Sequence, residues 1–94
     1  MSEPKFSSKM LVSTPAAIAA FERSGDSMRI FLAKHFALDK GTLCEEDHQL
    51  NLQSIVKGKE TRVFSAFTLS DSTKIWIITE WDRSVTTVLL PEEY

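Results

Sequence analysis

The sequence predicts a single α+β domain in which about three N-terminal helices pack on a three-stranded antiparallel β-meander. Apolar side chains recur at helical intervals up to about residue 57, and the two-residue period of strands takes over from Arg62. The connections between the later segments are too short for parallel crossovers. The 94 residues, 43% of them hydrophobic and 26% charged, suffice for one core. Residues 1–10 are polar without a clear period, so we expect a flexible arm before a domain at 11–94.

The first two helices have recognisable ends. Thr14 followed by proline predicts an N-cap with proline at the first helical position, and Gly25 predicts the end of this helix. Asp26 or Ser27 is expected to cap a second helix, which runs through about Leu38. The apolar stripe of this second helix is expected to face the core.

A third helix is predicted from about Leu43 to Lys57, because Thr42 and Glu45 have the spacing of a capping box. Its first turn is acidic, with Glu45, Glu46 and Asp47. Negative charge interacts favourably with the N-terminal end of the helix dipole, which explains these residues without any partner. Two alternatives remain open, a contact surface for a protein partner and a local mimic of nucleic acid to which Asp39 would also belong.

Three strand-like segments follow, at residues 62–69, 74–80 and 84–90. In the middle segment, alternate residues point to opposite faces of the sheet. One face would carry Ile75, Ile77 and Thr79, and the other Lys74, Trp76, Ile78 and Glu80. Since Trp76 and Ile78 are too apolar for an exposed face, both faces are expected to be partly buried, the second by a partner or a second copy. A homodimer is therefore left open.

Charge and composition limit the classes of function. The net charge of −2 and the isoelectric point of 5.6 give no bulk attraction to nucleic acid or to anionic lipid, so direct nucleic-acid binding is disfavoured. A single cysteine, Cys44, permits no intramolecular disulfide, and no apolar run approaches the roughly 18 residues of a membrane span. We expect a cytoplasmic protein.

A polar segment, Trp81-Asp82-Arg83-Ser84, separates the last two strand-like runs. The simpler interpretation is a hairpin turn, because aspartate is favoured in turns. The functional interpretation makes Trp81 and Arg83 a contact pair for another protein, since both residue types are enriched at interface hot spots. The expected interaction surface comprises Trp76, Trp81, Asp82, Arg83, Glu45, Glu46 and Asp47.

One catalytic arrangement can be assembled from the sequence. His35 with Arg83, Ser84, Thr86 or Thr87 could cleave RNA, with histidine as acid or base and arginine stabilising the phosphorane. The order of helices before an antiparallel sheet resembles the barnase-like ribonuclease toxins in outline. The acidic surroundings of the last strands oppose this alternative.

We expect neither a metal nor another cofactor. Cys44 and His48 have the i, i+4 spacing of half a zinc site, but the remaining ligands would have to come from scattered carboxylates. All three glycines, Gly25, Gly41 and Gly58, stand at predicted helix ends, so the sequence contains no glycine-rich phosphate loop.

The final segment TKIWIITEWDRSVTTVLLPEEY, residues 73–94, resembles the shared ending of a group of small proteins carried by bacterial plasmids, phages and integrated elements. The TPAA start of the first helix, a histidine near the end of the second, the CEED segment at Cys44–Asp47 and the strand VFSAFTL are similar too. This chain departs from the group at FALDKG, residues 36–41, where a GDWG-like stretch is usual, and at SDST, where the group has a glycine-bearing turn.

The resemblance implies an accessory protein of a mobile element that acts by binding and not by catalysis. Some members carry a label linking them to restriction-modification, although this chain contains no catalytic motif that supports such an activity. The implied partner is a protein of the host or of the element that works in defence or in nucleic-acid metabolism. The departures after His35 weaken the idea of a shared active site there.

Overall fold

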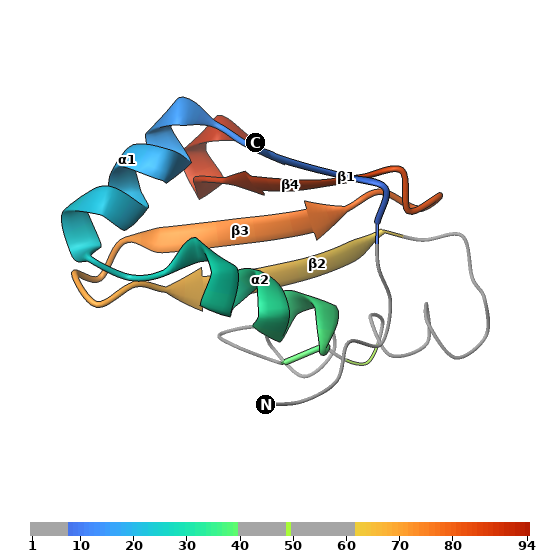
Figure 1. Cartoon of the computed structure of the whole chain (residues 1–94), viewed down its shortest axis with the longest axis horizontal. Helices are drawn as coiled ribbons and strands as arrows, with labels where there is room; N and C mark the ends of the chain where they lie inside the picture. The colour runs from blue at the N-terminus through green and yellow to red at the C-terminus, as the bar shows by residue number, and fades with distance from the viewer. Residues whose placement is uncertain (1–7, 40–48, 50–61) are drawn as a thin grey trace.

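The computed structural model describes residues 8–39, 49 and 62–94 of the chain (Figure 1). The described part is an α+β unit with two helices and a four-stranded mixed sheet. Its elements, in chain order, are β1 (Met10–Ser13), α1 (Pro15–Ser24), α2 (Met28–Phe36), β2 (Val63–Thr68), β3 (Lys74–Thr79), β4 (Val85–Leu89) and the short 3-10 helix η1 (Pro91–Glu93).

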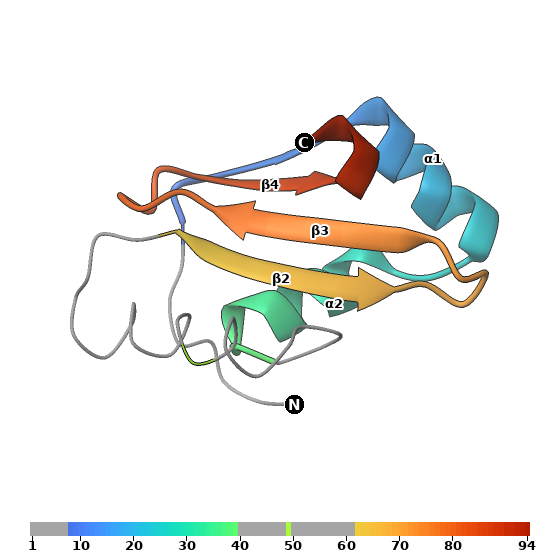
Figure 2. The ribbon, with the colours of Figure 1, turned by 180° about the vertical axis from the view of Figure 1, so that it is seen from behind.

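The predicted antiparallel meander is confirmed. β2 pairs with β3 and β3 pairs with β4, with Ser65 opposite Ile77 and Thr79 opposite Thr86 (Figure 2). The prediction of only three strands is wrong, because β1 adds a fourth strand parallel to β4, and the strand order is β1-β4-β3-β2. Met10–Ser13 is too short to show a period, and its partner lies more than 70 residues later in the chain, so local pattern gave no signal.

The first helix forms as its sequence predicts. The Thr14 hydroxyl accepts a hydrogen bond from the Ala17 N–H at 3.1 Å, which satisfies one of the free donors at the start of α1. Gly25 closes the helix with φ of 78°, in the left-handed region, and its N–H donates to the Phe21 carbonyl.

The second helix ends earlier than predicted, and its start differs in detail. α2 stops at Phe36 instead of about Leu38, because Leu38 adopts φ of 60°. Ser27 occupies the N-cap position, but its side chain makes no capping bond. Asp26 instead ties the start of α2 to the β2–β3 connection, where its carboxylate accepts the Ser70 N–H and hydroxyl, both at 2.7 Å.

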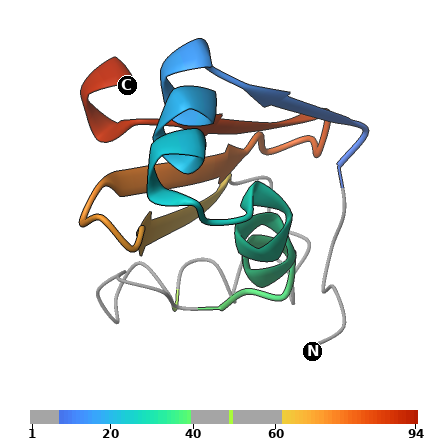
Figure 3. The ribbon, with the colours of Figure 1, turned by 60° about the vertical axis from the view of Figure 1, so that its left-hand side comes forward.

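Both helices cover the same face of the sheet, as the turned view shows (Figure 3). Phe31 of α2 bridges α1 and the sheet, with ring centroids 5.8 Å from Phe21 and 5.3 Å from Phe67. Ile75 and Ile77 of β3 are fully buried beneath the helices, which stabilises the fold by about 2 kcal/mol for each side chain.

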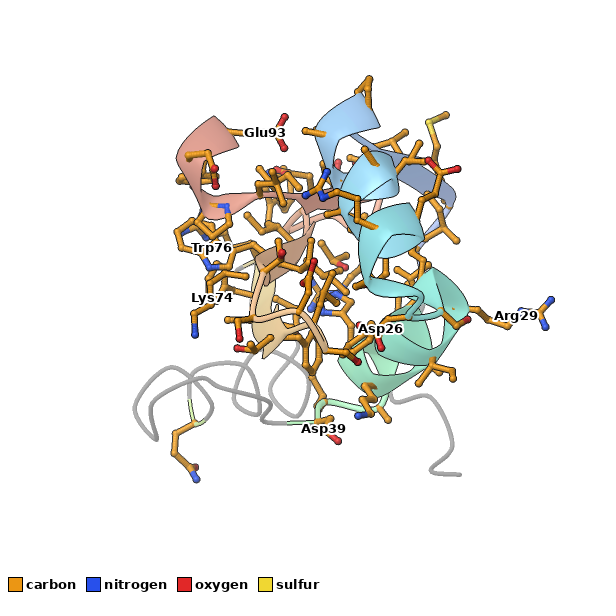
Figure 4. All side chains as sticks on the ribbon, turned by 90° about the vertical axis from the view of Figure 1, so that its left-hand side faces the viewer. Asp26, Arg29, Asp39, Lys74, Trp76 and Glu93 are labelled. Atoms are coloured by element: carbon orange, nitrogen blue, oxygen red, sulfur yellow. The ribbon has the colours of Figure 1, made fainter. Side chains whose placement is uncertain are left out.

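The opposite face is also partly buried, as predicted, although the cover seen here comes from side chains of the chain itself. Trp76 packs between Phe64 and Tyr94, with centroid distances of 4.9 and 5.6 Å, and Ile78 is only 4% exposed. Figure 4 shows Trp76 and Lys74 on the side of the sheet away from the helices.

The predicted third helix, residues 43–57, lies outside the described residues except for Gln49, so the structure does not test it. The acidic Glu45, Glu46 and Asp47 lie outside them as well, as do Cys44 and His48. None of the helices in the described ranges is long and apolar enough to cross a membrane.

Candidate functional site

The polar segment between β3 and β4 forms a closed hairpin turn. The Glu80 N–H donates to the Val85 carbonyl at 3.0 Å, and the Arg83 N–H donates to the Glu80 carbonyl at 2.9 Å. The Asp82 carboxylate accepts the Ser84 N–H at 3.0 Å, and hydrogen bonds from Ser84 lower the pKa of Asp82. These contacts explain why aspartate stands here: its side chain replaces a backbone acceptor within the turn.

Arg83 has an unfavourable backbone conformation within the turn. Its φ of 61° lies in the left-handed region, which a residue with a Cβ atom adopts only at some cost. The guanidinium folds back and donates to the carbonyls of Glu80 and Trp81 at 3.3 and 3.2 Å. Trp81, in contrast, is 52% exposed, so the turn holds a large aromatic side chain toward solvent.

His35 lies in the opposite environment. Its side chain is 0% exposed, beneath α2 and against the sheet. Nδ1 lies 2.6 Å from Ser65 Oγ of β2, and Nε2 lies 2.7 Å from Thr79 Oγ1 of β3. Thr79 in turn hydrogen-bonds Thr86 of β4 at 2.7 Å.

The direction of these hydrogen bonds is fixed by Ser8, the last residue in the chain of contacts. The Ser8 hydroxyl donates to the Met10 carbonyl and accepts from Thr86. Thr86 donates its one hydroxyl proton to Ser8, so in its contact with Thr79 it can only accept, and Thr79 is the donor. The Thr79 hydroxyl then has no proton left for His35, so it accepts a hydrogen bond from the imidazole. The imidazole therefore carries its proton on Nε2, and Nδ1 accepts from Ser65.

Electrostatics agree with a neutral imidazole. Burial, with a smaller effect from the positive charge of Arg83, lowers the pKa of His35 from 6.5 to about 3. A general base needs a lone pair that can reach a substrate proton, and both ring nitrogens of His35 are already hydrogen-bonded inside the protein. The arrangement holds three strands and α2 together.

The residues predicted to act together are thus divided between two environments. His35 and Thr86 belong to the buried network, whereas Asp82, Arg83 and Ser84 belong to the turn. Thr87 points to the opposite face from Thr86, because the two are adjacent on one strand. Of the two tryptophans, Trp76 is half-buried in the aromatic cluster and Trp81 is the exposed one.

Ser65 and Thr79 were not predicted from the sequence as hydrogen-bond partners of His35. A signal was present: Ser65 alternates with Val63 and Phe67 and therefore faces the core, where a hydroxyl needs a hydrogen-bonding partner. A helical histidine on an apolar stripe has the same need. Over the ranges 8–39 and 62–94, no cluster of three or more metal-ligating side chains occurs.

Comparison of the chain with protein-family models, with curated proteins and with solved structures finds no match. Function is therefore inferred from the chemistry of this chain and from the resemblance of its final segment described above.

Proposed function

We propose that this protein is a non-catalytic protein–protein interaction module whose contact surface is centred on the 81–84 turn. The observation that supports this proposal most is Trp81, a large aromatic side chain that is half-exposed on a turn whose polar groups are hydrogen-bonded internally. Tryptophan and arginine are the residue types most enriched at interface hot spots, and a fixed turn loses little entropy on binding.

The partner that we propose is a protein of the host cell or of a mobile element, working in defence or in nucleic-acid metabolism. The net charge of −2 supports a protein partner over direct contact with a phosphate backbone. The acidic residues 45–47 belong to the same proposed surface, although they lie outside the described residues.

Affinity capture from bacterial extract tests the proposal. Immobilised wild-type protein is compared with Trp81→Ala and with Ile30→Ala, a control that truncates another exposed apolar residue, 50% exposed on α2. A protein retained by the wild type and by Ile30→Ala, but lost with Trp81→Ala, is the expected result. The proposal fails if Trp81→Ala retains the same proteins as the wild type, or if the wild type cleaves total RNA and His35→Gln does not.

A further inference from the structure

The β1 edge of the sheet exposes apolar side chains on both of its faces. Met10, Leu11 and Val12 are 58%, 56% and 40% exposed. Leu11 aligns with the buried Thr86 on the helix-covered face, whereas Met10 and Val12 lie on the opposite face. Among the described strands, β1 has β4 as its one neighbour, and its other side faces outward at the top of the sheet in Figure 1.

This edge lacks the devices that normally prevent strands from pairing with other chains. Natural edge strands carry inward charges, proline or bulges, because an unpaired backbone edge is a template for a further strand. The sequence MLVS of β1 contains no charge and no proline. The strand at the other edge, β2, differs, because every one of its side chains is buried or half-buried.

We propose that β1 pairs antiparallel with β1 of a second copy of this chain, so that the two sheets become continuous. Two sheets joined edge to edge in this way are related by a two-fold axis normal to the sheet, which leaves each side chain on its own face. The axis must then pass midway between the two copies of one residue. With the axis at Leu11, Leu11 meets Leu11 of the second copy on one face, and Met10 meets Val12 on the other, so each of the three exposed side chains packs against one from the second copy.

Charge at the two ends of the edge is complementary under the same operation. In this register Lys9 lies opposite Ser13 of the second copy, next to Thr14. The Thr14 hydroxyl donates to Glu93 Oε1 at 2.7 Å, and Figure 4 shows Glu93 beside the first turn of α1. The pairing therefore brings Lys9 of each copy near Glu93 of the other.

The pKa of Asp82 is lowered mainly by hydrogen bonds from Ser84, and the positive charge of Lys9 adds a smaller effect, so Lys9 also interacts with Asp82 of its own copy. The Lys9 N–H donates to the Arg83 carbonyl at 3.1 Å, so the 81–84 turn lies at this end as well. Asp82 and Arg83 use their side chains within the turn. A parallel alignment of two β1 strands would place Lys9 against Lys9, so the charges favour the antiparallel dimer.

Sedimentation over a range of protein concentrations tests the proposal. The wild type is expected to rise from its monomer mass of 10.6 kDa toward twice that value. Leu11→Lys, which places a charge on the axis, is expected to stay monomeric at every concentration, with an unchanged circular dichroism spectrum because Leu11 is exposed. Ile30→Lys is the matched control and is expected to dimerise like the wild type.

A second measurement distinguishes strand pairing from other association. Amide hydrogen exchange in β1 should slow as the wild type dimerises, and this protection should be absent in Leu11→Lys. In a Cys44→Ser background, Leu11→Cys should form a disulfide-linked dimer and Ile30→Cys should not, because residues opposite each other on antiparallel strands lie within disulfide distance. A wild type that is monomeric throughout, or a Leu11→Lys dimer as tight as the wild type, overturns the proposal. This inference does not depend on the proposed function, which concerns the turn.

Discussion

The two polar regions that the sequence singles out, around His35 and at residues 81–84, differ in their relation to solvent. His35 is completely buried and bonded through both ring nitrogens, while Trp81 at the turn is half-exposed. Judged only by residue type, a histidine close to a serine and a threonine is compatible with catalysis. Because their hydrogen bonds are all made inside the protein, these groups are part of the fold, and recognition is left to the exposed turn.

The largest effect is expected from truncating the buried region. His35→Ala removes the acceptor for the Ser65 hydroxyl and the donor to the Thr79 hydroxyl and opens a cavity, so the free energy of unfolding should fall by about 3 kcal/mol or more. Urea denaturation at neutral pH measures it. Lys34→Ala, at an exposed neighbour on the same helix, is the matched control and should cost under about 1 kcal/mol. Equal stability of the two variants would contradict the structural role of His35.

Acid should destabilise the protein through the same residue, His35. The unfolded chain takes up a proton at His35 below pH 6.5, whereas the folded protein resists protonation down to about pH 3. The contribution of His35 to stability is therefore complete above pH 6.5 and should fall as the pH drops between these two values, by about 1.4 kcal/mol per pH unit. Urea denaturation across this range measures the slope. His35→Gln should reduce it, and an unchanged slope in that variant would contradict this assignment.

A smaller effect is expected at Thr86, one step from the outer end of the buried network. Thr86→Val keeps the branched shape that suits a strand but removes the acceptor for Thr79 and the donor to Ser8, so it should cost about 1 to 2 kcal/mol. Thr87→Val makes the same change one residue further along, on the other face, and should cost less. Thermal or urea unfolding of the pair provides the comparison, and an equal loss in both variants would argue against a directed chain of hydrogen bonds.

The smallest effect is expected in the exposed turn. Arg83→Gly removes two guanidinium hydrogen bonds but relieves the left-handed backbone conformation, so its stability should stay within about 0.5 kcal/mol of the wild type. If the variant unfolds like His35→Ala, the turn is part of the stabilising framework and the contrast between the two regions is lost.

The sequence predicted the parts of this fold that depend on local signals. Thr14 and Gly25 mark both ends of α1, and alternation within residues 74–80 separates the two faces of β3. It did not predict β1, because a four-residue strand is stabilised by pairing with β4 and not by its own pattern. The hydrogen-bond partners of His35 could not be predicted from the sequence either, because the packing of α2 on the sheet decides which strand hydroxyls His35 reaches.

Titration of the His35 imidazole would show whether this side chain belongs to the buried framework or is open to solvent. The Cε1 proton of His35, assigned with a His48→Gln variant, is followed by NMR from about pH 8 to about pH 4. The account predicts a flat chemical shift in the folded protein, with nitrogen shifts of the tautomer protonated at Nε2, because the ring is buried and its pKa is lowered to about 3. A sigmoidal titration near the ordinary value of 6.5 would show a solvent-accessible histidine and would contradict the account.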